Sequence, residues 1–223
     1  IWEVYRLDAD LMGTAVRAGG ALGARLQLEC GTHRWNVRLV PSGLWSPRYV
    51  HRVLRPDGSV DSVQRTKEVA FKGTTEAGDP VRLTIDHHFI YGYVEESEDT
   101  WYIEPVRYLD TEAAADWYVI YPRSGVMPVE GVVCATETDA QEAARHFGPS
   151  KLPPGGAESQ MACYEAEIAI ASDRSMFDKY GSTAGVEAHN AAVLNDVQGN
   201  YTNGQFTHNI NFQIVTSFTV TGT

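Results

Sequence analysis

Cys134 lies between an apolar Gly-Val-Val run and an acidic, threonine-rich stretch, in GVMPVEGVVCATETDAQE. A cysteine thiolate is a nucleophile and a zinc ligand, whereas a buried thiol packs as a small apolar side chain. The sequence therefore leaves Cys134 open as a core thiol, half of a disulfide, or a ligand. The other cysteines are Cys30 and Cys163, and this odd count leaves at least one thiol without an internal partner.

The histidines do not form a recognisable catalytic metal motif. None of the seven is followed by Glu, so the chain contains no HExxH, the helical motif in which two histidines bind zinc and the glutamate acts as base. We expect His87 and His88 to be strand neighbours that point to opposite faces and therefore do not chelate one ion. The acidic pairs Glu95-Glu96 and Glu98-Asp99 are interpreted as a solvated turn, not as a glycosidase dyad.

The charge balance restricts the partners. Asp and Glu outnumber Lys and Arg by 29 to 18, for a net charge of −11. Nucleic acids and anionic membranes attract basic surfaces, so we expect neither as a partner. No apolar run approaches the roughly 20 residues that span a bilayer. The hydrophobic fraction of 43% is sufficient for a globular core.

Residues 1–122 are predicted to form an antiparallel β-domain. ARLQLEC at 24–30 and RWNVRLVP at 34–41 alternate apolar and polar residues, as half-buried strands do. The Pro-Asp-Gly sequence at 56–58 predicts a hairpin turn between two extended runs. The stretch 69–110 reads as four short strands separated by turns.

Residues 123–162 are rich in Pro, Gly, Ser and Ala, and we interpret them as an exposed linker with one short helix predicted at 138–147. Exposed linkers are where proteases cut, and the Pro-Pro-Gly-Gly sequence at 153–156 is a suitable place for cleavage.

Residues 163–223 are predicted to form a strand, a helix and a second strand. YEAEIAIASD reads as the first strand, and Asp173 is expected to end it and cap the next turn. Ser182 or Thr183 is a suitable N-cap for the helix, and Gly199 a suitable terminator. HNINFQIVTSFTVTG is rich in β-branched and aromatic residues, as strands are. This order predicts a parallel pair of strands joined by a crossover helix.

EIAIASDRSMFDKYG resembles the first strand of the catalytic domain in reprolysin-like, adamalysin-type zinc metalloproteases of the metzincin group. The residues at the same spacing are Glu167, Asp173, Met176, Lys179 and Tyr180. GVEAHNAAVLNDVQGNYTN resembles that family's first helix, and INFQIVTSFTV its second strand. Upstream, RWNVRLVPSGLWSPRY and the stretch from FKGTTEAGDP to YIEPV resemble the family's propeptide.

The resemblance implies an α+β precursor: a β-rich propeptide domain of antiparallel strands at 1–122, a linker with the inhibitory cysteine segment at 123–162, and the first strand-helix-strand of an α/β zincin catalytic domain at 163–223, truncated before the zinc-binding helix. In this family a propeptide cysteine ligates the catalytic zinc and keeps the zymogen latent, which gives that role to Cys134. The tripeptide that follows it is Ala-Thr-Glu where Gly-Val-Thr is usual. This chain alone is expected to be inactive.

The full-length protein would then be a secreted zinc metalloendopeptidase. Its partners would be its own catalytic domain and polypeptide substrates, and calcium is a further implied cofactor. Glu167 is a calcium ligand in some members, although we favour a solvent-facing strand carboxylate here.

Alternatives remain open at the level of the sequence. The β-rich half could be a secreted carbohydrate- or protein-binding module without catalytic activity, since the chain has five Trp and eleven Tyr. A pseudo-enzyme whose propeptide fold serves as an interaction surface is a third hypothesis. Cys30 and Cys163 could form a disulfide, which suits secretion, or could remain separate thiols.

Overall fold

The computed structural model describes residues 2–65, 67–127, 164–202 and 209–222. Its strands form two sheets, and most strand pairs are antiparallel. The strands are β1 (Glu3–Arg6), β2 (Ala24–Cys30), β3 (His33–Pro41), β4 (Trp45–Leu54), β5 (Val60–Val63), β6 (Ala70–Thr75), β7 (Pro80–Asp86), β8 (Phe89–Glu95), β9 (Thr100–Pro105), β10 (Trp117–Pro122), β11 (Tyr164–Ser172) and β12 (Ile210–Val220). The α-helices are α1 (Ala9–Ala18), α3 (Arg174–Tyr180) and α4 (Thr183–Thr202), and short 3-10 turns cover Gly20–Leu22, Val106–Tyr108 and Arg123–Gly125.

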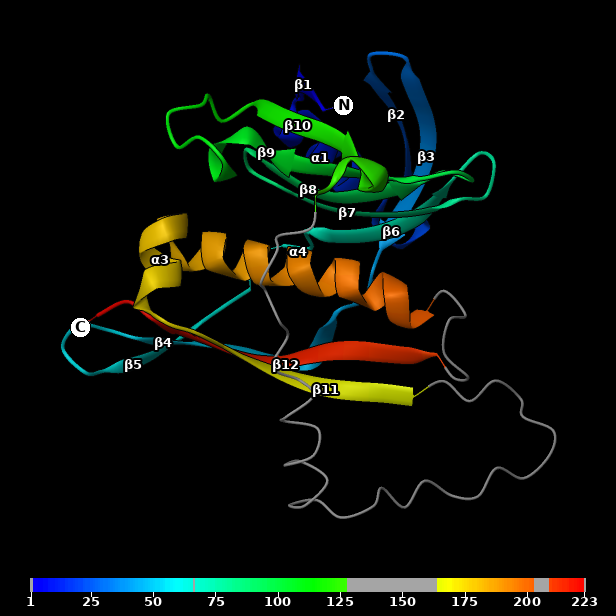
Figure 1. Ribbon diagram of the computed structural model, residues 1–223. Helices are drawn as coiled ribbons and strands as arrows, with labels where there is room; N and C mark the ends of the chain where they lie inside the picture. The colour runs from blue at the N-terminus through cyan, green and yellow to red at the C-terminus, as the bar shows by residue number, and fades with distance from the viewer. Residues whose placement is uncertain (1, 66, 128–163, 203–208, 223) are drawn as a thin grey trace, which may run out of the picture.

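The larger sheet has eight strands in the order β1-β10-β9-β8-β7-β6-β3-β2, and every neighbouring pair in it is antiparallel. The sheet is curled, and α1 packs on one face of it (Figure 1). Asp8 is the N-cap of helix α1, and its side chain accepts a hydrogen bond of 2.8 Å from the Leu11 amide. The sequence analysis did not anticipate this helix.

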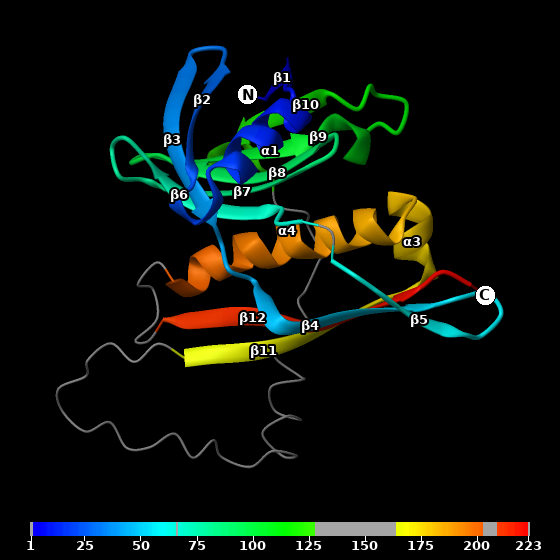
Figure 2. The ribbon, with the colours of Figure 1, turned by 180° about the vertical axis from the view of Figure 1, so that it is seen from behind.

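The smaller sheet joins parts of the chain that are far apart in sequence. Its order is β11-β12-β4-β5, in which β12 lies parallel to both β11 and β4. Strands β3 and β6 pair with each other in the larger sheet. The β4–β5 hairpin, which lies between them in sequence, extends away from that sheet and belongs to the smaller one (Figure 2). The predicted hairpin around 56–58 and the predicted parallel strand pair are both confirmed.

Helix α4 lies between the two sheets (Figures 1 and 2). Ser182 caps it, since its Oγ accepts a hydrogen bond of 3.0 Å from the Gly185 amide. The expectation that Gly199 ends the helix is wrong, because the helix continues to Thr202. Gly199 is buried instead beneath Tyr93, where a Cβ atom would meet the Tyr93 hydroxyl at 1.9 Å. The glycine therefore allows α4 to approach the larger sheet closely.

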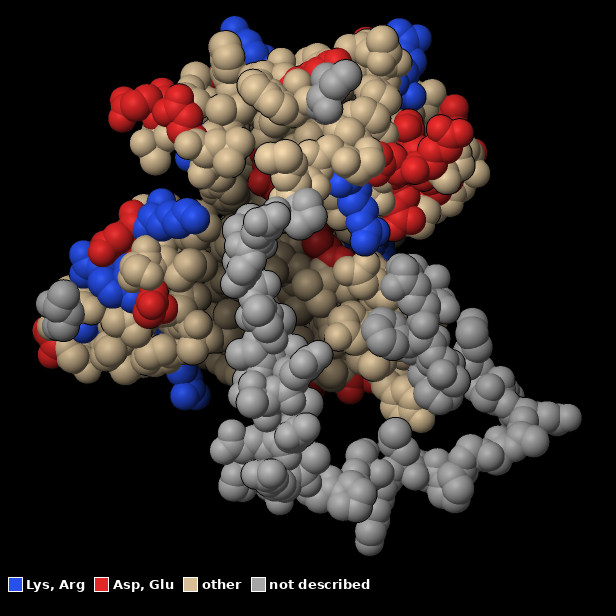
Figure 3. Space-filling view, in the orientation of Figure 1, with Lys and Arg blue, Asp and Glu red and all other residues tan. Residues whose placement is uncertain are grey.

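The structure confirms a β-rich α+β chain. No helix among the described residues has the length and apolar character needed to cross a bilayer. Acidic side chains gather over the eight-stranded sheet on the face shown in Figure 3, whereas Lys and Arg are more scattered there.

Candidate functional site

The most unusual feature of the molecule is the contrast between the two faces of β7 and β8. On the face that packs against α1, the side chains are aliphatic and include Leu83, Ile85 and Ile90. On the face that packs against α4, the intervening side chains include Arg82 and Tyr93. Both faces are buried, so the difference is not one of exposure to solvent. The α4 interface therefore combines small apolar residues such as Ala188 and Ala191 with buried polar and aromatic side chains, in a place where a sheet core is usually aliphatic.

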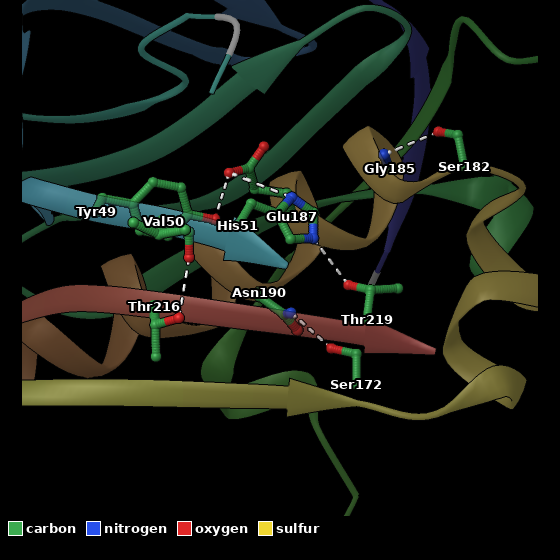
Figure 4. A network of polar contacts seen from close by, with 10 residues as sticks. All are labelled: Tyr49, Val50, His51, Ser172, Ser182, Gly185, Glu187, Asn190, Thr216 and Thr219. Carbon is green, nitrogen blue, oxygen red and sulfur yellow. Dashed lines mark hydrogen bonds and ion pairs between the residues drawn. The ribbon is translucent and has the colours of Figure 1, made fainter. Parts of the chain in front are cut away.

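A first polar network joins β4, α4 and β12 (Figure 4). The Tyr49 hydroxyl donates a hydrogen bond of 2.5 Å to Glu187 Oε1. His51 Nε2 lies 3.0 Å from Thr219 Oγ1, and His51 Nδ1 lies 3.9 Å from Glu187 Oε1. The network thus connects the hairpin of the β-rich segment with both the helix and the second strand of the segment after residue 163.

Burial determines the charge states in this network. It raises the pKa of the Glu187 carboxyl, although the hydrogen bond from Tyr49 opposes the shift. It also lowers the pKa of His51, so the imidazole is held in its neutral form. A histidine beside a carboxyl group has the parts for proton transfer, but His51 is 1% exposed and Glu187 8% exposed. Both side chains are thus shielded from solvent, and the network joins the structural elements around it.

A second polar network lies toward the C-terminal end of α4. Asn195 Nδ2 donates to the Phe71 carbonyl at 3.0 Å, and an Arg82 guanidinium nitrogen donates to Thr202 Oγ1 at 3.0 Å. Burial raises the pKa of Asp196 well above its ordinary value, and the Glu104 carboxylate adds to this shift. These contacts hold α4 against the larger sheet through polar side chains that could form hydrogen bonds with water instead if the two were separated.

Gln198 performs the same function toward the smaller sheet. Its Nε2 donates to the Ile210 carbonyl at 2.8 Å, and its Oε1 accepts from the Phe212 amide at 2.5 Å. Because one side chain satisfies two backbone groups of β12, it fixes the position of that strand against α4.

An aromatic cluster surrounds the N-terminal half of α4. The Tyr180 ring stacks on His189 with ring centroids 4.4 Å apart, and the Tyr108 hydroxyl lies 3.3 Å from His189 Nδ1. Burial, with a smaller contribution from Lys179, lowers the pKa of His189 to about 4. His189 is therefore neutral at physiological pH and is part of the packed interface.

The residues that sequence reasoning selected are dispersed. Cys134 and Cys163 lie outside the described residues, as does the helix predicted at 138–147. Cys30 is buried at the end of β2, and burial raises the pKa of its thiol to about 11. Since Cys163 is outside the described residues, a Cys30–Cys163 disulfide remains a prediction.

The two acidic residues of the predicted first catalytic strand have simple roles. Glu167 is exposed on β11 and accepts a hydrogen bond from the Arg48 guanidinium, as a solvent-facing strand carboxylate can. Asp173 caps α3, as expected: its Oδ1 accepts from the Met176 amide at 3.1 Å and from the Ser175 hydroxyl at 2.7 Å. These hydrogen bonds lower the pKa of Asp173.

Two sequence interpretations are corrected by the turns of the larger sheet. His87 and His88 are not opposite-facing strand neighbours, because they form the two-residue turn between β7 and β8 and their ring centroids lie 3.9 Å apart. Glu96 is more than a solvated turn residue, because it accepts hydrogen bonds from the indole nitrogens of Trp35 at 2.6 Å and Trp101 at 3.0 Å. The indole N–H groups of these two tryptophans are therefore both satisfied within the fold.

The α4 interface itself was missed by sequence reasoning. The available signal was the set of polar residues inside the helix, at Glu187, Asn195 and Gln198, which a solvent-facing position would explain equally well. No protein-family model matches this chain, and no curated protein matches it.

Proposed function

We propose that this chain is the N-terminal part of a secreted zinc metalloendopeptidase precursor, in which the β-rich segment folds and restrains the segment that follows residue 163. The observation that carries the proposal is the set of buried polar side chains, among them Arg82 and Asn195, that take part where α4 meets the larger sheet on the side opposite α1. Interfaces between partners that separate retain a surface-like composition, whereas permanent ones resemble an apolar core. A segment that is held first and released later would need an interface of this composition.

The pairing between β4 and β12 supports the same proposal. The Ile214 amide donates to the Leu44 carbonyl at 2.7 Å, and the Thr221 amide donates to the Leu54 carbonyl at 2.9 Å. Addition of a strand to a sheet edge uses main-chain groups that water can satisfy after release. Strands β11 and β12 alone would be a two-stranded pair, which is marginally stable in water. The β4–β5 hairpin would therefore act as a folding template.

Latency would depend on Cys134, in keeping with the family resemblance. The 223 residues contain no HExxH, so the zinc site of the full-length enzyme would be formed by residues outside this chain. In that enzyme, zinc would activate the water that hydrolyses polypeptide substrates. The Cys134 thiolate has the ligand chemistry to occupy the position of that water. Cleavage near 153–156 would then separate the two segments.

The template function can be tested in the intact chain by replacing residues 153–156 with the recognition sequence of a specific protease. After cleavage, we expect the two pieces to elute together in native buffer and to separate in mild urea. The isolated C-terminal piece should regain its secondary structure only when the N-terminal piece is added. The uncut chain is the control. Refolding of the C-terminal piece alone would contradict the template function.

The latch can be tested by titrating the chain against a reprolysin-type catalytic domain in a peptidase assay. We expect the wild-type chain to inhibit, Cys134→Ala to inhibit much more weakly, and the matched Cys163→Ala variant to behave as wild type. Equal inhibition by all three proteins would show that Cys134 is not the latch. No inhibition by any of them would favour the binding-module hypothesis.

A further inference from the structure

A cluster of three potential metal ligands lies at the other side of the larger sheet, away from α4. His87 Nδ1 is 2.8 Å from Asp10 Oδ1, and the His88 ring lies against that of His87 at an interplanar angle of 45°. One ligand atom from each of the three residues lies within 4.8 Å of the other two. His87 and His88 come from the β7–β8 turn and Asp10 from the first turn of α1, so two separate elements contribute to the cluster.

The backbone of His88 has a conformation that is uncommon for a residue other than glycine. Its φ is +49°, and among the described residues it is the only non-glycine with a positive φ. Short turns place Gly, Asn or Asp at such positions because other side chains are strained there. Strained residues are concentrated at functional sites, where another requirement outweighs the strain. The turn geometry does not require an imidazole at this position, so the presence of a histidine at residue 88 needs another explanation.

The cluster opens onto solvent. His88 and Asp10 line a cleft of about 500 Å³, together with Asp8 and Asp116. Arg6, which also lines the cleft, is paired with Asp116, so its positive charge is compensated. Among the described residues, Asp8 and Asp10 remain as unpaired negative charges of the lining, apart from the contact of Asp10 with His87, so a cation at the cluster would lie in acidic surroundings and remain accessible to water.

We propose that Asp10, His87 and His88 form a binding site for a divalent first-row transition metal such as Zn²⁺. Two imidazole nitrogens and one carboxylate oxygen are ligands that suit zinc, nickel or copper, whereas calcium and magnesium prefer oxygen ligands alone. Zinc bonds of about 2.0–2.2 Å place tetrahedral ligands roughly 3.3 Å apart, which small rotations of these side chains would reach. The cleft leaves the remaining position to water. This site is separate from the catalytic zinc of the proposed enzyme and shares no ligand with it.

The test is a Zn²⁺ titration by calorimetry on chelator-treated protein in the Cys134→Ala background, which removes the thiol that the proposed function assigns to zinc. We expect one Zn²⁺ ion per chain. Loss of a residue that hydrogen-bonds to a metal ligand typically weakens metal binding by about 10–100-fold. His87→Asn and His88→Gly remove a ligand itself, so each should weaken Zn²⁺ binding by about 100-fold or more. Asp10→Asn should weaken binding as well, whereas Asp110→Asn, a matched exposed aspartate, should not.

Stability gives an independent readout. Without metal, His88→Gly should raise the melting temperature, because glycine adopts a positive φ without strain. With Zn²⁺, the melting temperature of the parent protein should rise and that of His88→Gly should not. The proposal is overturned if the parent protein binds no Zn²⁺, or if the His87, His88 and Asp10 variants bind it as tightly as the parent does.

Discussion

The Tyr49 hydroxyl donates a 2.5 Å hydrogen bond to Glu187 across 138 positions of sequence. Tyr49 belongs to the hairpin that leaves the larger sheet, and Glu187 to the helix between the sheets. The bond therefore joins the β-rich segment to the segment after residue 163 at a position that is shielded from water. Its removal should affect the association of the two segments more than it affects either segment alone.

Tyr49→Phe should lower the free energy of unfolding by about 1–3 kcal/mol, because the Glu187 carboxyl stays buried and loses its donor. Urea denaturation of the intact chain measures this change. In the chain cut at 153–156, the same substitution should also weaken the association of the two pieces.

Trp35→Phe is a control, because the Trp35 indole nitrogen donates to Glu96 Oε1 at 2.6 Å and both residues belong to the β-rich segment, away from α4. It should destabilise that segment without weakening the association of the two pieces. If both variants weaken the association equally, the Tyr49–Glu187 bond has no special role between the segments.

Gly199→Ala should destabilise the protein by about 1–3 kcal/mol, although alanine is the better helix former. The added Cβ would meet the Tyr93 hydroxyl at 1.9 Å, so α4 or the β8 side chain must move. Thermal unfolding of the variant measures the cost. Tyr93→Phe in the same protein should restore part of the loss, since it removes the nearest atom.

Gly13→Ala in α1 is the control for helix propensity. Its Cβ would meet only the end of the flexible Arg17 side chain, at 2.6 Å. This variant should be neutral or stabilised by up to about 1 kcal/mol. A stabilised Gly199→Ala variant would show that α4 does not pack closely under Tyr93.

His189 should contribute a pH dependence to stability. Burial lowers its pKa to about 4 from an ordinary value of 6.5. The unfolded chain therefore takes up the proton first as pH falls, so the contribution of His189 is fully present above pH 6.5 and is lost down to about pH 4. Asp196 acts in the opposite direction, because its raised pKa makes the folded chain retain a proton.

Because these two contributions oppose each other, the effect of His189 is measured by comparing the stabilities of the wild type and a His189 variant at each pH. His189→Gln cannot take up the proton, so its stability relative to wild type should rise as pH falls from 6.5 to 4. Urea midpoints at several pH values in this range measure the difference. A constant difference between the two proteins would show that His189 titrates alike in the folded and unfolded chains.

Local patterns were sufficient for much of the fold. The alternation in β2 and β3, the turn at 56–58 and the cap at Asp173 are properties of neighbouring residues and were predicted correctly, and Ser182 was one of two candidates for the cap of α4. The missed helix α1 also had a local signal in the capping side chain of Asp8, but its ten residues lie in a segment dominated by strands.

The parts that failed depend on contacts between distant residues. His51 and Thr219 lie 168 positions apart, and nothing near either residue indicates that their strands are neighbours. The burial of polar residues on α4 follows from the position of the helix between two sheets, so its apolar periodicity could not reveal which residues face inward. The prediction for His87 and His88 was wrong because it extended the alternation of a strand through these two residues, whereas the chain turns there between β7 and β8.

Hydrogen exchange should show that β4 belongs energetically with β12, although it is continuous in sequence with β3. In the cut chain in mild urea, separation of the pieces should expose the amides of β4 and β12 at the same urea concentration. The amides of β3 and β6 should stay protected, because those strands pair with each other within the larger sheet. Mass spectrometry of peptides from these strands measures the exchange. If β4 instead keeps the protection of β3 and β6 after β12 has lost its own, the hairpin is not held by the second sheet and its role as a template fails.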